Sequence, residues 1–268
     1  MAADRFFICN TVAGASQFQL RFSKTGPEAC TPGRSSVDLS SMSEMKGHER
    51  IGRGLDIAVA ATVANVGCDL LLHSGPSAGA DISDTAFLLP ALASLPVWRV
   101  GLGAGLGLVF ISSWLLTAPA LFVLLRGVRP WVRDAVMSSL AVFTVSSAAF
   151  HGSYAVSAAA GRLVGAEALD PATSAATIET AMMAIIVPMM GSLFVLSALL
   201  AGSILGGRTA MPRWTAAASP LLFASLPPML ASLLPAPWGG TVAIAASTAG
   251  LAGFLVFLRS CWRRYGRG

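Results

Sequence analysis

Charged residues are scarce in this sequence. Asp, Glu, Lys and Arg make up 12% of its 268 residues, which is far below the share usual in soluble domains. By contrast, 54% of the residues are hydrophobic and the mean hydropathy is +0.70. The net charge is +5, but the basic residues lie in short connections and near the two ends rather than in one patch. The composition therefore excludes an ordinary soluble domain and indicates no nucleic-acid partner.

Residues that bind metals or act in redox chemistry are also few. The sequence has three His and four Cys. The cysteines do not follow the close spacings of zinc or thiol–disulfide motifs; they are Cys9, Cys30, Cys68 and Cys261. We therefore predict no metal site and no cofactor, and the sequence assigns no catalytic residue.

Apolar runs of roughly 20 residues, the length needed to cross a bilayer core, are what the sequence has in abundance. Several are rich in Gly, Ala and Ser, which let membrane helices approach closely. We predict an all-α fold, a polytopic membrane bundle of about six transmembrane helices, with prolines such as Pro119 and Pro188 kinking their helices. The predicted spans are 54–75, 101–125, 135–160, 179–205, 213–234 and 239–258.

Lys and Arg fall in alternate connections between these spans. On one side lie 16 of the 18 basic residues, and on the other only Arg99 and Arg162. Since Lys and Arg favour cytoplasmic loops, this distribution predicts six spans with both termini in the cytoplasm. Lys occurs only at Lys24 and Lys46, and with abundant Ala this composition is typical of bacterial proteins. The predicted location is therefore the bacterial inner (plasma) membrane, with membrane lipids as partners.

The segments outside the spans divide the chain further. Residues 1–50 lack helical periodicity, so we interpret them either as a disordered cytoplasmic extension or as a mis-called start that precedes Met42 or Met45. Residues 51–260 form the predicted six-helix domain, and 261–268 a basic cytoplasmic tail. The stretch 76–100 contains too few apolar residues to cross a bilayer. We expect there an outer loop with a short helix at the membrane interface, anchored by Trp98.

Ionisable groups inside a span are costly and mark candidate functional sites. Asn65, Asp69 and His73 are spaced at i, i+4 and i+8, which places them on one helical face. Asp69 lies 15 residues from the inner end of its span and His151 lies 16 residues from the start of the third. Their depths therefore match. The candidate ligand-binding residues in the outer half of the bundle are Asn65, Asp69, His73, His151, Tyr154 and Glu179.

This cluster supports several functions. We predict an outward-facing polar pocket that binds a lipid-like or small polar ligand. A carboxylate beside an imidazole is also suited to acid–base work, which leaves open a membrane hydrolase using Asp69 and His151. A proton-coupled carrier in which Asp69 titrates is a third possibility, although the almost entirely apolar inner halves of the spans argue against transport. The fourth possibility is a structural or assembly role, in which Asp69 and His151 only fix the packing of their helices. Glu179 would then be a first-turn acidic residue, which the helix dipole favours.

Several short motifs resemble an uncharacterised bacterial multi-pass integral-membrane family. They are Gly67-Cys68-Asp69-Leu70-Leu71-Leu72 in the first span, His151 in the third, the turn Leu234-Pro235-Ala236-Pro237-Trp238-Gly239-Gly240, and Ser247-Thr248-Ala249-Gly250. The resemblance covers about 50–260. It implies a polytopic helical fold and carries no established activity.

Overall fold

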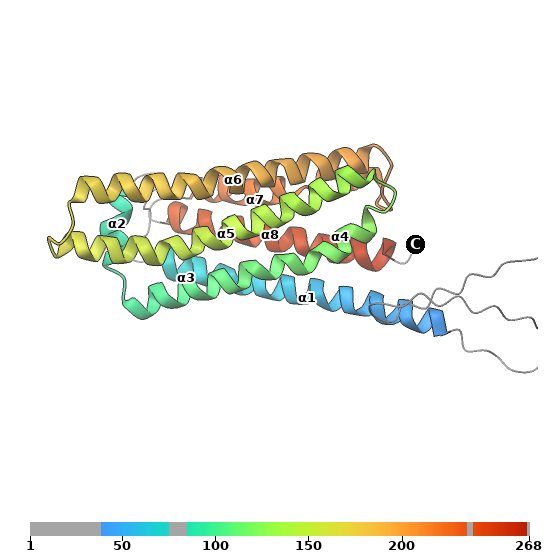
Figure 1. Ribbon diagram of the computed structural model, residues 1–268, viewed down its shortest axis with the longest axis horizontal. Helices are drawn as coiled ribbons and strands as arrows, with labels where there is room; N and C mark the ends of the chain where they lie inside the picture. Colours follow the sequence, from blue (N-terminus) through green and yellow to red (C-terminus); the bar gives the residue numbers. More distant parts are fainter. Residues whose placement is uncertain (1–38, 75–84, 235–237, 267–268) are drawn as a thin grey trace, which may run out of the picture. The chain divides into compact units, whose positions relative to one another are not determined.

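The structure is a computed structural model that describes residues 39–74, 85–234 and 238–266. The expected extension over 1–38 lies outside them. The described residues form a helical bundle without strands (Figure 1). Its elements are α1 (Leu39–His73), α2 (Thr85–Ala93), α3 (Val97–Ser112), η2 (Ser113–Thr117), α4 (Ala118–Leu124), α5 (Pro130–Gly165), α6 (Pro171–Leu205), η3 (Arg213–Ala217), α7 (Pro220–Ala231) and α8 (Trp238–Tyr265).

Five passages of the bundle are long and apolar enough to cross a membrane. They are Met45–His73, Val97–Leu124, Pro130–Gly165, Pro171–Leu205 and Val242–Tyr265. The predicted all-α membrane bundle is therefore confirmed. The first helix differs at its start, because α1 begins at Leu39, within the segment 1–50 that we expected to be non-helical.

The predicted fifth span, 213–234, is a broken passage. Its longest helix, α7, has 12 residues, or about 18 Å, which is shorter than the ~30 Å hydrocarbon core. Pro212 and Pro220 are the physical reason, since each stands just before or at the first residue of a separate helix and donates no backbone hydrogen bond. The chain nevertheless returns along α6, where the Leu221 amide donates to Ser197 Oγ at 2.9 Å.

Helix α7 packs closely and antiparallel to the first half of α8. Ser247 Oγ on α8 donates to the Ala224 carbonyl on α7 at 2.9 Å. A Cβ atom on Gly250 would lie 1.7 Å from the Phe223 carbonyl oxygen, so only glycine permits this approach. Although α7 is short, it is therefore packed closely against α8.

Prolines have different effects in the other helices. After α3 the backbone tightens into the 3₁₀ turn η2, and α4 begins with Pro119 in its first turn, as expected of a kinked span. Helix α6, by contrast, runs unbroken through Pro188. The N-cap of α6 is Asp170, whose carboxylate accepts from the Thr173 amide at 2.7 Å. This hydrogen bond lowers the pKa of the Asp170 carboxyl below its usual value.

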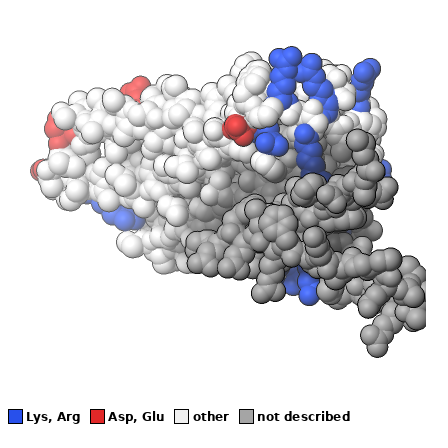
Figure 2. Space-filling model, turned by 45° about the vertical axis from the view of Figure 1, so that its right-hand side comes forward, with Lys and Arg blue, Asp and Glu red and all other residues white. Residues whose placement is uncertain are grey.

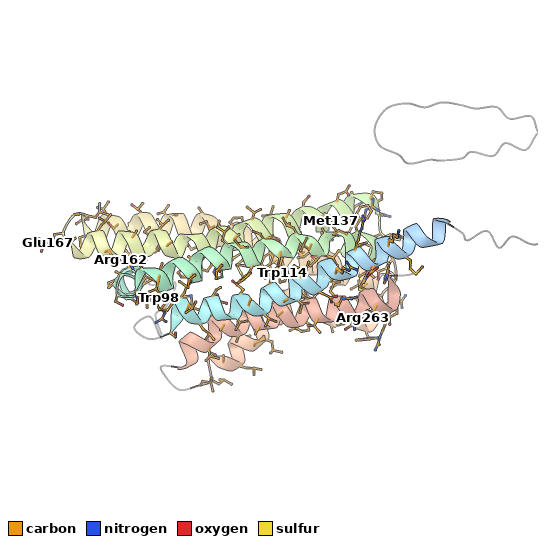
Figure 3. The ribbon with its side chains drawn as sticks, turned by 90° about the horizontal axis from the view of Figure 1, so that it is seen from below. Trp98, Trp114, Met137, Arg162, Glu167 and Arg263 are labelled. Atoms are coloured by element: carbon orange, nitrogen blue, oxygen red, sulfur yellow. The ribbon has the colours of Figure 1, made fainter. Side chains whose placement is uncertain are left out.

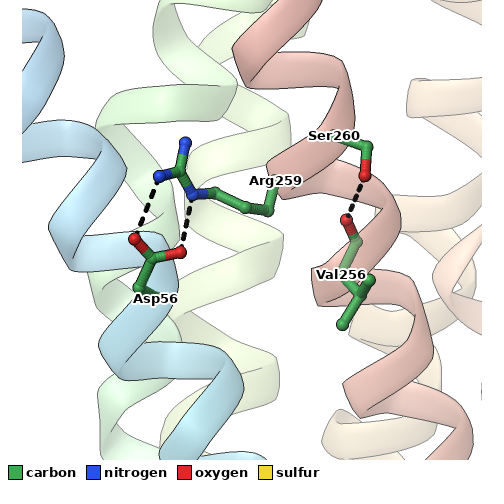
Figure 4. Close-up of polar contacts among 4 residues, drawn as sticks. All are labelled: Asp56, Val256, Arg259 and Ser260. Atoms are coloured by element: carbon green, nitrogen blue, oxygen red, sulfur yellow. Dashed lines mark hydrogen bonds and ion pairs between the residues drawn. The ribbon is translucent and has the colours of Figure 1, made fainter.

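Most charged side chains lie at the two ends of the bundle, and Figure 2 shows Lys and Arg gathered mainly at one of them. At this basic end, Arg259 on α8 makes a two-pronged ion pair with Asp56 on α1, at 2.7 and 2.9 Å (Figure 4). Within α1, Arg53 pairs with Glu49. His48 on α1 stacks on Trp262 on α8, with ring centroids 4.6 Å apart. The Asp56–Arg259 and His48–Trp262 contacts join the first and last helices at one end.

The opposite end of the bundle carries α2. Its Leu88 and Leu92 are fully buried, so this short helix packs into the end of the bundle rather than only lying on its surface. The two basic residues of this end bind helix carbonyls. Arg99 donates to the carbonyls of Leu71 and Ser74 at the end of α1. Arg162 donates to those of Ala93 and Leu95 at the end of α2, the latter at 2.8 Å. Figure 3 shows Arg162 and Trp98 at this end and Arg263 at the other.

Two apolar clusters fill the interior. The larger lies toward the basic end and includes Leu55, Trp114, Leu121, Phe143, Leu196 and Leu255. The smaller lies under α2 and includes Leu72, Leu88, Leu92, Ala104, Tyr154 and Ile178. The polar residues of α1 and α5 lie between them.

Candidate functional site

A cavity of about 420 Å³ lies between the two apolar clusters. Four predicted site residues line one wall: Asn65 and Asp69 from α1, and His151 and Tyr154 from α5. The rest of the lining is mostly apolar and comes from several helices, including Ile111, Trp114, Phe143, Ile186, Met190, Leu193, Ala243 and Ile244. Its size falls within the usual range of small-molecule sites.

Asp69 and His151 form a buried pair across the two helices. His151 Nε2 lies 3.2 Å from Asp69 Oδ1, and the side chains are 7% and 2% exposed, respectively. The amide of Asn65 lies one turn before Asp69 on α1, 3.4 Å from the same ring nitrogen. The equal depths inferred from the sequence therefore do bring Asp69 and His151 together.

A glycine of α3 holds the imidazole in place. A Cβ atom at Gly107 would lie 2.3 Å from His151 Nδ1, so the ring occupies the space that any other residue would fill. The Nδ1 edge therefore faces the backbone of α3, and Nε2 faces Asp69.

Several buried polar atoms of this wall have no hydrogen-bond partner among the described residues. They include Asp69 Oδ2 and Tyr154 Oη, and these residues are only 2% and 1% exposed. Leaving a buried polar group unsatisfied costs about 1–3 kcal/mol. Native structures seldom retain such groups unless a ligand, an ion or water pairs with them.

The other two predicted residues lie apart from this wall. His73 is buried beside it, with its ring edge-on to Tyr154 at 5.0 Å, but it does not line the cavity. Glu179 is exposed on α6 and joins no part of the site. It also lies in the third turn of α6, because that helix begins at Pro171 rather than at residue 179. The N-cap role belongs to Asp170.

Sequence reasoning missed two parts of the cavity. Trp114 Nε1 donates to Thr62 Oγ1 at 2.9 Å, and Thr62 in turn donates to the Ala58 carbonyl. Thr62 precedes Asn65 by three residues on the same helical face, which is the signal that could have found it. Opposite, Ser225, Ser247 and Thr248 line the cavity from α7 and α8. Their serine and threonine types gave no such signal, because these residues commonly bond their own helix in membranes.

The cavity reaches the surface at the side of the bundle. Its polar wall is buried, while lining residues of α6, α7 and α8 are partly exposed, among them Met190 at 46%. Around this side α6 carries further exposed apolar residues, including Met183, Val187 and Phe194. The leucines of α2 cover the end toward which we expected the pocket to face.

The geometry bears on the chemistry that the pair can perform. A hydrolytic triad needs a nucleophile at the ring nitrogen that does not face the carboxylate, and here that nitrogen packs against Gly107. Among the described residues, no three His, Cys, Asp or Glu side chains lie close enough to hold a metal ion together. The wall is best suited to hydrogen bonding within an apolar cavity.

Comparison with known proteins places the chain in a family. Residues 42–264 match the model of a family described as a family of unknown function (DUF6796). This match confirms the resemblance to an uncharacterised family drawn from the sequence. No curated protein and no solved structure matches the chain.

Proposed function

The chain belongs to this family of unknown function, and we propose that it is an integral membrane protein that binds a lipid-like, amphipathic ligand. The ligand's apolar part would occupy the cavity beside Ile186, Met190 and Ile244, with its polar group against Asp69 and His151. The protein would reside in a bacterial inner membrane, with both termini in the cytoplasm.

One observation carries this proposal: a buried carboxylate oxygen without a partner among the described residues, in a mostly apolar cavity. Asp69 Oδ2 lacks a hydrogen bond among the described residues, although Asp69 is 2% exposed. A group of this kind is expensive inside a membrane and is retained where it serves a function. A purely structural Asp69 would need only its contact with His151, which uses Oδ1 and leaves Oδ2 unexplained.

The position of the cavity mouth supports entry from the bilayer. The mouth lies among α6, α7 and α8, and its surroundings include the exposed apolar residues Val187 and Phe194. A ligand dissolved in the bilayer can reach such an opening without crossing water. The leucines over one end and the larger apolar cluster toward the other leave no polar path, which favours binding over transport.

The proposed orientation rests on charge. Described arginines at the end shared by the α1 start and the α8 terminus include Arg126, Arg208, Arg259 and Arg263, whereas Arg99 and Arg162 lie at the other end. Positively charged ends of membrane helices favour the cytoplasm.

The test compares wild-type protein with Ile186→Trp and Val195→Trp. Ile186 lines the cavity. Val195 does not line it, is 43% exposed, and lies two residues after the lining Leu193, on the opposite side of α6. Each protein is purified in mild detergent, incubated with a lipid extract of the expression host, and examined by native mass spectrometry. We expect wild type and Val195→Trp to retain a bound lipid-like mass and Ile186→Trp to lose it, because the indole fills the cavity.

Two results would overturn the proposal. Retention of the same mass by Ile186→Trp would place the bound lipid outside the cavity. Absence of any retained mass from wild type after exposure to the extract would remove the case for a lipid-like ligand. Unfolding temperatures of all three proteins in detergent serve as the control for folding.

A further inference from the structure

We infer that the ligand's polar group is a hydroxyl, so that the cavity binds a long-chain or polycyclic alcohol and rejects lipids with anionic head groups. This inference rests on the proposed function and specifies the ligand's chemistry. It follows from the hydrogen-bonding capacity that the wall at Asp69 leaves unused.

Asp69 presents an acceptor on the side away from His151. Asp69 Oδ1 lies 3.2 Å from His151 Nε2, so this contact uses Oδ1 and leaves Oδ2 outside it. A carboxylate oxygen accepts hydrogen bonds. Asp69 Oδ2 has no donor among the described residues, so the ligand must supply one.

A ligand hydroxyl can satisfy a second group at the same time. Tyr154 Oη also lacks a partner, and Tyr154 lines the same cavity as Asp69. A phenol can donate to an oxygen. A hydroxyl therefore donates to Asp69 Oδ2 and accepts from Tyr154, whereas an ether only accepts and an ammonium group only donates.

Anionic head groups do not fit this wall. A carboxylate or phosphate would bring negative charge to an acceptor oxygen, and such groups are normally held by Arg or Lys. None of the described residues lining the cavity is Arg or Lys. The arginines lie at the two ends of the bundle instead.

The experiment measures four probes that share one alkyl chain: hexadecan-1-ol, its methyl ether, palmitate and hexadecylamine. Delipidated protein in detergent is titrated with each probe at equal mole fractions, and occupancy is read by native mass spectrometry. We expect the alcohol to bind about tenfold more tightly than the ether or palmitate, because only the alcohol pairs with the buried acceptor. Hexadecylamine is expected to bind no more tightly than the alcohol.

Two variants separate the two hydrogen bonds. In Asp69→Leu the preference for alcohol over ether should fall to about one, because the acceptor is gone. In Tyr154→Phe both probes should weaken while their ratio is kept, since both accept from the tyrosine. The ratio of alcohol to ether binding is measured within each variant, so a fraction of unfolded protein lowers the binding of both probes equally and leaves the ratio unchanged.

Equal binding of palmitate and the alcohol, equal binding of ether and alcohol, or tighter binding of the amine would each overturn the hydroxyl assignment. In any of these cases, if the probes that bind wild type do not bind Ile186→Trp, the cavity remains the binding site and only the assignment of the head group is wrong. If no probe distinguishes Ile186→Trp from Val195→Trp, the proposed function fails as well.

Discussion

His151 owes its position to a residue that is not on its own helix. The ring fits against α3 only because Gly107 has no side chain. Gly105, two residues earlier on the same helix, has open space around the position of a Cβ atom. These two glycines therefore allow the role of one contact to be separated from the general effect of glycine in a helix.

We expect Gly107→Ala to destabilise the protein by about 1–3 kcal/mol, because the added methyl group forces the imidazole away from Asp69. Gly105→Ala should be neutral or stabilising by up to about 1 kcal/mol, from helix propensity alone. Thermal unfolding in the same detergent measures both. Similar stability in the two variants would show that His151 is not held against Gly107.

At the level of elements, the ends of helices are fixed by side chains as much as by the apolar pattern. Arg99 and Arg162 each bind the last carbonyls of a neighbouring helix. Asp170 caps the first turn of α6. The span predicted for that helix begins at 179, eight residues after Pro171, because Pro171–Ile178 is less uniformly apolar than the sequence that follows.

The cap at Asp170 should make the first turn of α6 sensitive to acid. The hydrogen bond from Thr173 lowers the pKa of Asp170 in the folded protein. Its stabilising contribution is therefore complete above the ordinary Asp pKa of about 3.9 and is lost as the pH falls through the lowered folded value. We expect Asp170→Ala to loosen this turn at neutral pH.

Hydrogen exchange at the Thr173 amide is the measurement for this cap. Asp170→Asn is the control, since Asn also caps helices but does not titrate. Comparing wild type with Asp170→Asn at each pH cancels the intrinsic pH dependence of exchange. If the ratio of Thr173 protection in wild type to that in Asp170→Asn stays constant down to strong acid, the ionised Asp170 carboxylate does not stabilise this turn.

At the scale of the whole molecule, one ion pair connects the first and last helices of the bundle. The ion pair between Asp56 and Arg259 joins residues 203 positions apart and holds α1 beside α8 at the basic end. Because both side chains are near the surface, the pair contributes at most about 1 kcal/mol. The stability of the bundle therefore depends mainly on packing between its helices.

Single cysteines at the two ends test the proposed orientation. In a variant with the four native cysteines replaced, we expect Ala172→Cys to react with an impermeant maleimide from outside intact cells, and Ala210→Cys to react only after lysis. Both alanines are exposed and lie in or near connections at opposite ends. Labelling of Ala210→Cys in intact cells would reverse the topology.

The sequence by itself determined the class of the protein and the residues at its centre. Apolar runs of membrane length indicate helices, because a helix pairs the backbone N–H and C=O groups of its own segment, which lipid cannot do. Helical spacing placed Asn65 and Asp69 on one face, and equal depth matched Asp69 with His151. Both inferences depend only on distances along a helix, which the sequence specifies directly.

Only the tertiary structure decided which groups meet across helices. It placed Gly107 behind the imidazole, turned Glu179 to the surface, paired Asp56 with Arg259, and covered one end with α2. It also opened the cavity toward the side of the bundle. Such features depend on how each helix is rotated and how closely its neighbours pack, and lipid gives no hydrophobic preference that would reveal these rotations in the sequence.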